Sequence, residues 1–368
     1  MIKPMYKLLL SVCCLFLMSW GYSVNSDRVM LIFAPMGEGD YTAVLRIYPN
    51  GRIEDTGQKL QTGYGCVWGG VSPKQDYYLI NPYRQLSQYY ISSNGTVSLI
   101  TVYQTMNAAD TKYLPNGKMV ISTDTGQTFR VLDNGLLEFT GTFSGGLPCF
   151  IHPSGNMVCT FTGYGVMVYS VDTLSNILML HQTVEFDDPN FSPAVSGYGV
   201  FSPNEKEFII SGGGKGQIRV YSVKSDWTLD TSYYTVYFSG EFGSRDMFWS
   251  LDEEDLFVVC EVTDNICLVS RDTITGFWKD TGKRWKTGYS PWIVKRTPDW
   301  NLVVSDELDT TTFKKELVTY RLTPTNDLEP TGYRFPFQAT FGDIPPNFDI
   351  AYPQAATSVP ESAWRKEE

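Results

Sequence analysis

The sequence predicts an all-β protein, a seven-bladed β-propeller whose blades each contain four strands. Three observations lead to this fold: a strand–turn–strand unit recurs along the chain, two series of turns share one period, and the chain ends carry complementary parts of a blade. The 368 residues also exceed the roughly 250–300 residues at which a single hydrophobic core stops growing. An array of repeats avoids this limit because each unit packs only on its neighbours.

The clearest repeat lies at residues 199–224. Its apolar run at 208–210 is typical of a buried strand, and residues 218–223 alternate with a two-residue period. A Ser-Pro-Asn-Glu turn starts at Ser202 and a glycine-rich loop follows at 212–214, and both break the chain between strands. The unit therefore contains three successive strands and no helical segment.

Two series of turns run through the chain with the same spacing of about 40 to 50 residues, the period of a propeller blade. The first series separates the first and second strands of each unit and begins at Ser72, Leu114, His152, Ser202, Ser250 and Thr297. The second closes the hairpin between the third and fourth strands, at Asn50, Asn94 and Asn134 and after Tyr169, Tyr221, Val269 and Tyr320. The second series has seven members, one for each blade, and therefore predicts seven blades.

The two ends of the chain are expected to complete one blade together. Residues 28–53 contain three strand-like runs, which predict the second, third and fourth strands of a blade. The missing first strand is expected at 348–352, so that the N-terminal strands pair with a C-terminal strand and leave no exposed sheet edge. The propeller accordingly spans 28–352, and residues 353–368 form a polar C-terminal tail.

Residues 1–23 resemble a secretory signal peptide. Lys3 and Lys7 form a positive start, and the apolar stretch 8–18 precedes a group of small residues. The stretch is shorter than the about 20 residues of a spanning helix. We therefore expect a secreted or periplasmic protein without a membrane span after cleavage; an uncleaved anchor and a lipid on Cys13 are the alternatives.

The chain is acidic, with a formal net charge of −11, and loss of Lys3 and Lys7 with the leader makes it more negative. An acidic surface repels phosphate backbones, so we expect no nucleic-acid partner. A protein or a carbohydrate is the expected partner, and the sequence leaves the oligomeric state open.

The repeats resemble those of WD-repeat and lactonase-type propellers across most of 28–352. The similarity rests on FSPNEKEFIISGG…IRVYSV at 201–223, LPNGKMVIST at 114–123 and HPSGNMVCTF…VMVYSV at 152–171. Tyr-Ser stands at Tyr169 and Tyr221, where WD repeats carry Trp-Asp, which makes the chain more similar to the bacterial type. The resemblance implies the fold and no single activity, because propellers carry many functions.

One face of a propeller surrounds the central channel, the usual site for ligands. The loops between blades and between second and third strands form this face, and they carry Tyr64, Tyr198 and Tyr289 together with Arg84 and Arg245. Tyrosine rings can stack on a sugar or a peptide side chain, and an arginine can orient a carboxylate. Packing between blades and surface ion pairs are the alternatives.

Acidic residues gather in the same loops. Asp187 and Asp188 follow His181, and oxygen-rich clusters can hold Ca²⁺, although the spacing of a calcium-binding loop is absent. No GxSxG elbow occurs, and the other histidine, His152, lies in a turn expected to face away from the channel. We therefore expect no catalytic set, no metal site and no cofactor, with Ca²⁺ as the alternative.

Two of the seven cysteines lie in the leader. A two-residue turn would place Cys260 opposite Cys267, and a Pro-Ser-Gly turn would do the same for Cys149 and Cys159. Export permits disulfides, so both pairs are disulfide candidates; small, buried, free cysteines are the alternative. Cys66 would be left without a partner.

The segment 277–300 is basic and aromatic on an acidic protein. It interleaves Trp278, Trp285, Trp292 and Trp300 with lysines and arginines. Such a segment could contact an anionic glycan or a partner protein. Strands that turn their tryptophans to the core and their lysines to water give the same pattern.

Together these observations favour an exported, non-enzymatic propeller that acts as a protein- or glycan-binding or scaffold module. This preference for a binding module rests on the regular repeat and on the lack of a group of catalytic residues that the sequence would bring together. The alternative is a propeller-type hydrolase or lactonase, with an acidic and optionally metal-assisted site on the channel face around His181. A structural subunit of an envelope assembly, held through 277–300, is a third hypothesis.

Overall fold

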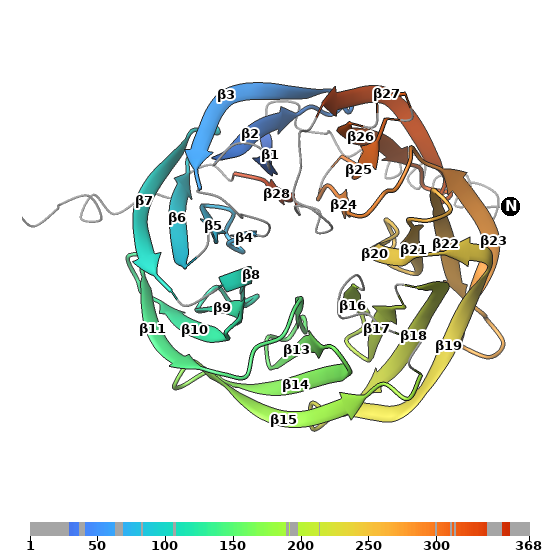
Figure 1. Cartoon of the computed structure of the whole chain (residues 1–368), viewed down its shortest axis with the longest axis horizontal. Helices are drawn as coiled ribbons and strands as arrows, with labels where there is room; N and C mark the ends of the chain where they lie inside the picture. The colour runs from blue at the N-terminus through green and yellow to red at the C-terminus, as the bar shows by residue number, and fades with distance from the viewer. Residues whose placement is uncertain are drawn as a thin grey trace, which may run out of the picture.

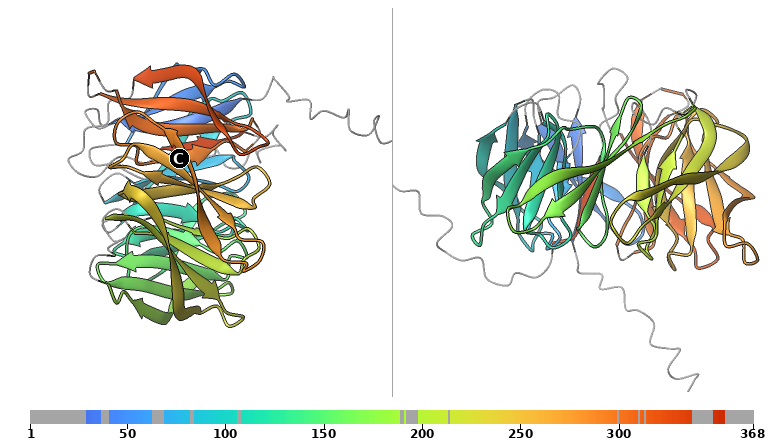
Figure 2. Two further views of the ribbon diagram at one scale, coloured as in Figure 1. Left: turned by 90° about the vertical axis from the view of Figure 1, so that its right-hand side faces the viewer. Right: turned by 90° about the horizontal axis from the view of Figure 1, so that it is seen from below.

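The structure is a computed structural model, and it describes residues 29–36, 41–62, 69–81, 84–105, 108–188, 191, 198–212, 214–298, 300–309, 311–312, 314–336 and 348–353. Seven four-stranded antiparallel sheets stand around a central channel (Figure 1). The side views in Figure 2 show the blades side by side in a thick disc. The predicted all-β, seven-bladed propeller is therefore confirmed. Among the described residues, no helix is long and apolar enough to cross a membrane.

The blades are numbered here around the ring, each with its innermost strand first. Blade 1 contains β28 (Asp349–Ala351), β1 (Met30–Met36), β2 (Tyr41–Ile47) and β3 (Ile53–Gln61). Blade 2 contains β4 (Gly69–Val71), β5 (Tyr77–Ile80), β6 (Gln85–Ile91) and β7 (Val97–Gln104). Blade 3 contains β8 (Ala108–Tyr113), β9 (Met119–Asp124), β10 (Gln127–Val131) and β11 (Leu137–Thr142).

The remaining four blades follow in chain order. Blade 4 contains β12 (Cys149–Ile151), β13 (Met157–Thr162), β14 (Gly165–Asp172) and β15 (Ile177–Glu185), and blade 5 contains β16 (Gly199–Phe201), β17 (Glu207–Ser211), β18 (Lys215–Val223) and β19 (Leu229–Phe242). Blade 6 contains β20 (Ser244–Trp249), β21 (Asp255–Cys260), β22 (Asn265–Arg271) and β23 (Trp278–Lys286). Blade 7 contains β24 (Val294–Arg296), β25 (Leu302–Leu308), β26 (Lys315–Leu322) and β27 (Leu328–Pro336).

Both ends of the described chain build blade 1, as the sequence predicts. The C-terminal strand β28 pairs antiparallel with β1, with Leu31 opposite Ala351 and Phe33 opposite Asp349. This pairing closes the ring and places Asp349 on the innermost strand of its blade.

The turns between strands lie where the two series predict them. The first series joins the innermost strand to the second strand in blades 2 to 7, and the second series closes the outer hairpin of every blade. Gly135 shows why such a hairpin needs glycine. Its φ is +82°, and an added Cβ would meet the Tyr77 hydroxyl at 2.3 Å, so an L side chain there would be both strained and blocked.

The hydrophobic core lies between the blades. Phe208 and Ile210 of β17 pack in the cluster shared with blade 4, while Ile209 packs in the cluster shared with blade 6. A strand buried on both faces needs an unbroken apolar run rather than alternation. At the closure of the ring, Phe33 of blade 1 stacks on Tyr78 of blade 2 with 4.0 Å between ring centroids.

The tryptophans of 277–300 belong to this core. Trp278 lies in the cluster between blades 5 and 6, and Trp300 lies in the cluster between blades 7 and 1. Trp285 and Trp292 are partly buried against neighbouring clusters. Alternation between core and water therefore accounts for the pattern of this segment.

Candidate active site

A cavity of about 460 Å³ lies in the channel between the innermost strands of blades 1 to 6. Much of its wall is apolar or aromatic, with Phe150, Phe201 and Trp249, and its charged lining residues are Lys112 and Asp349. Pro153, from the turn after β12, is also part of the wall. The cavity thus extends toward the face of the first-to-second-strand turns.

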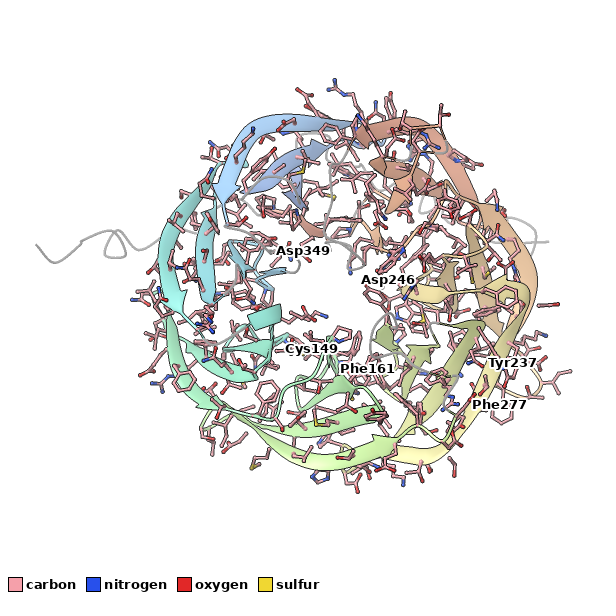
Figure 3. The ribbon with its side chains drawn as sticks, in the orientation of Figure 1. Cys149, Phe161, Tyr237, Asp246, Phe277 and Asp349 are labelled. Atoms are coloured by element: carbon pink, nitrogen blue, oxygen red, sulfur yellow. The ribbon has the colours of Figure 1, made fainter. Side chains whose placement is uncertain are left out.

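Three aspartates occupy matching places on innermost strands. Asp110 on β8 and Asp246 on β20 each accept the backbone N–H of the first residue of the next innermost strand, at 3.0 and 3.1 Å. Asp349 on β28 makes the same kind of bond to the first residue of β4. Each carboxylate thereby ties its blade to the next one, and Figure 3 shows Asp246 and Asp349 on the inner side of the ring.

The three aspartates differ in their other partners. Lys112 Nζ lies 3.3 Å from Asp110 Oδ2, and Lys295 Nζ lies 3.6 Å from Asp246 Oδ2. Oδ2 of Asp349 is buried and makes no hydrogen bond, and the same holds for Oδ1 of Asp110. Asp349 is therefore the cavity-lining carboxyl group with an oxygen left for a water or a ligand.

The surroundings of Asp349 raise its pKa to about 7. Burial is the largest cause, Lys295 and Lys112 act against it, and the negative charge of Asp110 adds to it. Burial alone would lower the pKa of Lys112, but Asp110, Cys149 and Asp349 together outweigh that effect and the pKa rises. At neutral pH the cavity therefore holds an ammonium group and a carboxyl group that can gain or lose a proton, as a general acid–base catalyst must.

We expect the Asp349→Asn protein to gain stability over the wild type as the pH rises from about 4 to 8. The folded pKa of about 7 lies above the ordinary value of 3.8, so this group's stabilising contribution is complete below about pH 4 and is lost as the pH rises through 7. Asparagine cannot ionise and carries no such loss. Thermal unfolding at each pH measures the difference in Tm; a difference that stays constant or shrinks toward pH 8 contradicts this assignment.

Tyr198 is the residue before β16 of blade 5. Its ring packs against the core cluster of blades 7 and 1. Burial raises the pKa of Tyr198 well above its usual value, and Asp246 and Asp306 raise it further. Its hydroxyl group therefore remains protonated and can donate a hydrogen bond.

Arg245 is held by protein groups. Its Nη2 lies 2.5 Å from Glu261 Oε2, and its guanidinium stacks 4.2 Å above the Trp292 ring. Arg245 therefore forms an ion pair, but one that is largely buried rather than on the surface. It is not a lining residue of the cavity.

The other predicted face residues are separate from the cavity. Tyr289 lies between β23 and β24 with its side chain about half exposed, at 49%. Arg84 is an exposed residue of the turn between β5 and β6, with φ of +61°. Tyr64 lies outside the described residues.

His181 does not lie on the channel. It is an exposed residue of β15, the outermost strand of blade 4, because the blade turns its fourth strand to the rim. Asp187 and Asp188 pair with the buried Arg219 of blade 5, at 3.1 and 3.6 Å. The expected acidic site around His181 therefore does not lie on the channel face. Asp187 and Asp188 instead neutralise the charge of the buried Arg219.

The predicted disulfide between Cys149 and Cys159 is wrong. Cys149 pairs with Thr160, whereas Cys159 pairs with Phe150. The two cysteines are thus one position away from facing each other, which turns their side chains to opposite sides of the blade. They accordingly pack in different core clusters.

Cys260 and Cys267 are also not directly opposite each other. Cys260 pairs with Asn265 and Cys267 with Val258, since four residues rather than two separate the strands. Both side chains nevertheless face the same side, and their sulfur atoms lie 3.4 Å apart as free thiols.

Sequence reasoning missed Asp110, Lys112 and Asp349. A periodic signal existed for Asp110: like Asp246, it stands four residues before the first turn of its unit. Nothing comparable marks Lys112, because a lysine on an innermost strand is recognised only once the channel is known.

No family model and no curated protein matches the sequence. Several solved structures are similar in fold. The periplasmic gluconolactonase PpgL of Pseudomonas aeruginosa shares 14% identity at a TM-score of 0.72, over 90% of this chain and 99% of its own. A protein assigned as a 6-phosphogluconolactonase from Bacteroides uniformis shares 16% identity at 0.70, over 88% and 100%. A similarly assigned protein from Bacteroides fragilis shares 15% at 0.70, over 90% and 99%.

These similarities confirm the seven-bladed β-propeller fold, and they do not support the WD-repeat resemblance. The main functional expectation, a binding or scaffold module without catalysis, is overturned. Three of the structures that resemble the chain along nearly its whole length carry lactonase names, which favours the hydrolase alternative.

Proposed function

We propose that the chain is a hydrolase that opens the ester bond of a sugar lactone in the channel cavity. The observation that carries this proposal is Asp349, a cavity-lining carboxyl group with a pKa of about 7 and an unpartnered oxygen, beside the cationic Lys112. The lactonase names of the similar structures support the reaction class.

The reaction balances with these two groups. The Asp349 carboxylate accepts a proton from a water molecule as the water oxygen bonds to the lactone carbonyl carbon. The ammonium group of Lys112 stabilises the negative oxygen of the tetrahedral intermediate. The bond from the carbonyl carbon to the ring oxygen then breaks, and protonated Asp349 returns its proton to the leaving oxygen, which yields the hydroxy acid.

The cavity chemistry fits a lactone without a phosphate group. Phe150, Phe201 and Trp249 supply flat apolar surface, which suits the C–H face of a sugar ring. Lys112 already lies against Asp110, so among the described lining residues no cation stands free of an acid. A phosphate dianion would meet net negative charge from Asp110 and Asp349.

The proposed location is extracytoplasmic. The predicted leader at 1–23, which lies outside the described residues, supports export, and one similar protein is periplasmic. We propose that the lactone substrate reaches the enzyme in that compartment.

The decisive experiment follows proton release by the purified protein at constant pH, with spontaneous lactone hydrolysis subtracted. We expect saturable hydrolysis of gluconolactone and at least tenfold lower kcat/KM for its 6-phosphate. A rate equal to the buffer background with both lactones over a wide concentration range would rule out the proposal.

Metal removal is expected to leave the hydrolysis rate unchanged, because Lys112 supplies the positive charge at the carbonyl oxygen. The measurement compares the initial rate before and after dialysis against a chelator, with Ca²⁺ added back as the control. A rate that falls with the chelator and returns with Ca²⁺ would show that the oxyanion assignment is wrong.

A further inference from the structure

Two buried thiols meet in the hairpin of blade 6. Cys260 ends β21 and Cys267 lies in β22, and neither side chain is exposed. They form a diagonal pair across the two strands, and both lie in the cluster shared with blade 5. With 3.4 Å between their sulfur atoms, each thiol is the nearest reactive group to the other.

Glu241 of β19 approaches the same place, and the three residues form a group that could hold a metal ion. Its carboxylate is already engaged, however. It accepts hydrogen bonds from Arg284 Nε at 2.9 Å and Asn265 Nδ2 at 3.0 Å, and another from the Thr263 hydroxyl group. A dication would have to displace these donors and lie beside a guanidinium charge, which makes covalent bonding between the sulfurs the more favourable use of the pair.

We propose that Cys260 and Cys267 form a disulfide within the hairpin when the chain folds in the presence of a disulfide oxidant. One thiolate attacks the oxidant's disulfide, forming a mixed disulfide and releasing one thiol. The second thiolate attacks the mixed disulfide, which joins the two protein sulfurs and releases the second thiol. The protein loses two protons and two electrons, and the oxidant gains them.

The sulfurs are separated by a short gap. Disulfide sulfurs lie about 2.05 Å apart, so the two sulfurs, now 3.4 Å apart, have to approach by roughly 1.4 Å. Once folded, the reduced pair should react slowly, because the thiol contact with Cys267 and burial raise the pKa of Cys260 well above its usual value and only the thiolate is nucleophilic. The bond is therefore formed before the blade is closed.

Folding of the full-length chain from denatured, reduced protein in a glutathione redox buffer tests the proposal. Free thiols are then alkylated after unfolding, and peptide mapping identifies each cysteine. We expect a Cys260–Cys267 link, an intact mass lower by two hydrogen atoms, and a Tm higher by a few degrees than that of protein folded with reductant.

Cys149 and Cys159 provide a matched internal control. They are equally buried and also lie on neighbouring strands, but they face opposite sides of their blade and should be recovered as alkylated thiols. Cys260→Ala and Cys267→Ala should each abolish the loss of two hydrogen atoms.

Two outcomes would overturn the proposal. One is recovery of Cys260 and Cys267 as alkylated thiols, or linkage of either one to another cysteine, after folding in the redox buffer. The other is a folded protein with both thiols intact and one zinc ion bound in native mass spectrometry. Both outcomes are independent of lactone hydrolysis.

Discussion

The Asp349→Asn protein is expected to lose lactone hydrolysis by about 10²–10⁴-fold in kcat while remaining folded. Asparagine has nearly the shape of aspartate, and its amide oxygen can still accept the bond from the start of β4. It cannot take a proton from water, so the step in which water attacks the carbonyl carbon loses its base. The initial rate in a pH-stat, together with Tm, measures both parts of this expectation.

The pH profile separates a base from a merely structural carboxylate. In the wild type, kcat should rise with pH through about 7, because the pKa of Asp349 is raised to about 7 and its ionised form accepts the proton. Asp230→Asn, a change at a partly exposed position on the outer strand β19, should keep the wild-type profile. If the Asp349→Asn protein retained the wild-type rate and the same rise, the base would have to be another residue.

The blade count was predictable because turn chemistry is local. Asn-Gly and Ser-Pro steps determine where a chain reverses whatever it later packs against, and the two series placed all seven hairpins. Ring closure followed from counting strands at the two ends. These conclusions needed no knowledge of which way any side chain points.

The active-site residues could not be predicted in the same way, because they depend on register. β8 and β20 each contain an irregularity next to the aspartate, between Ala108 and Thr111 and between Ser244 and Met247. One extra residue reverses the faces of a strand. The sequence alone therefore leaves open whether Asp110 faces the channel or a neighbouring blade.

The two cysteine pairs show that a shift of one residue in the strand pairing decides whether two side chains meet. A turn of four residues in place of two keeps Cys260 and Cys267 on one face, because the shift is even. For Cys149 and Cys159 the register differs by one residue, which separates them. Turn propensities do not distinguish these cases, and only the observed pairing decides between contact and separation.

Replacing Asp246 by alanine is expected to lower the free energy of unfolding by about 3 kcal/mol. Asp246 is 4% exposed, and its oxygens accept the N–H groups of Met247 at 2.9 Å and Val294 at 3.1 Å. Without them, two buried N–H groups lose their partners, each at a cost of roughly 1–3 kcal/mol. The nearby Lys295 ammonium is one-third exposed, so water compensates most of its loss.

Urea unfolding of matched variants tests this expectation. Asp246→Asn should fall between wild type and Asp246→Ala, because its amide oxygen can still accept one of the two bonds. Glu254→Ala, an exposed change in the turn of the same blade, should stay within about 0.5 kcal/mol of the wild type. If Asp246→Ala were no less stable than Glu254→Ala, the bond from blade 6 to blade 7 would not stabilise the ring.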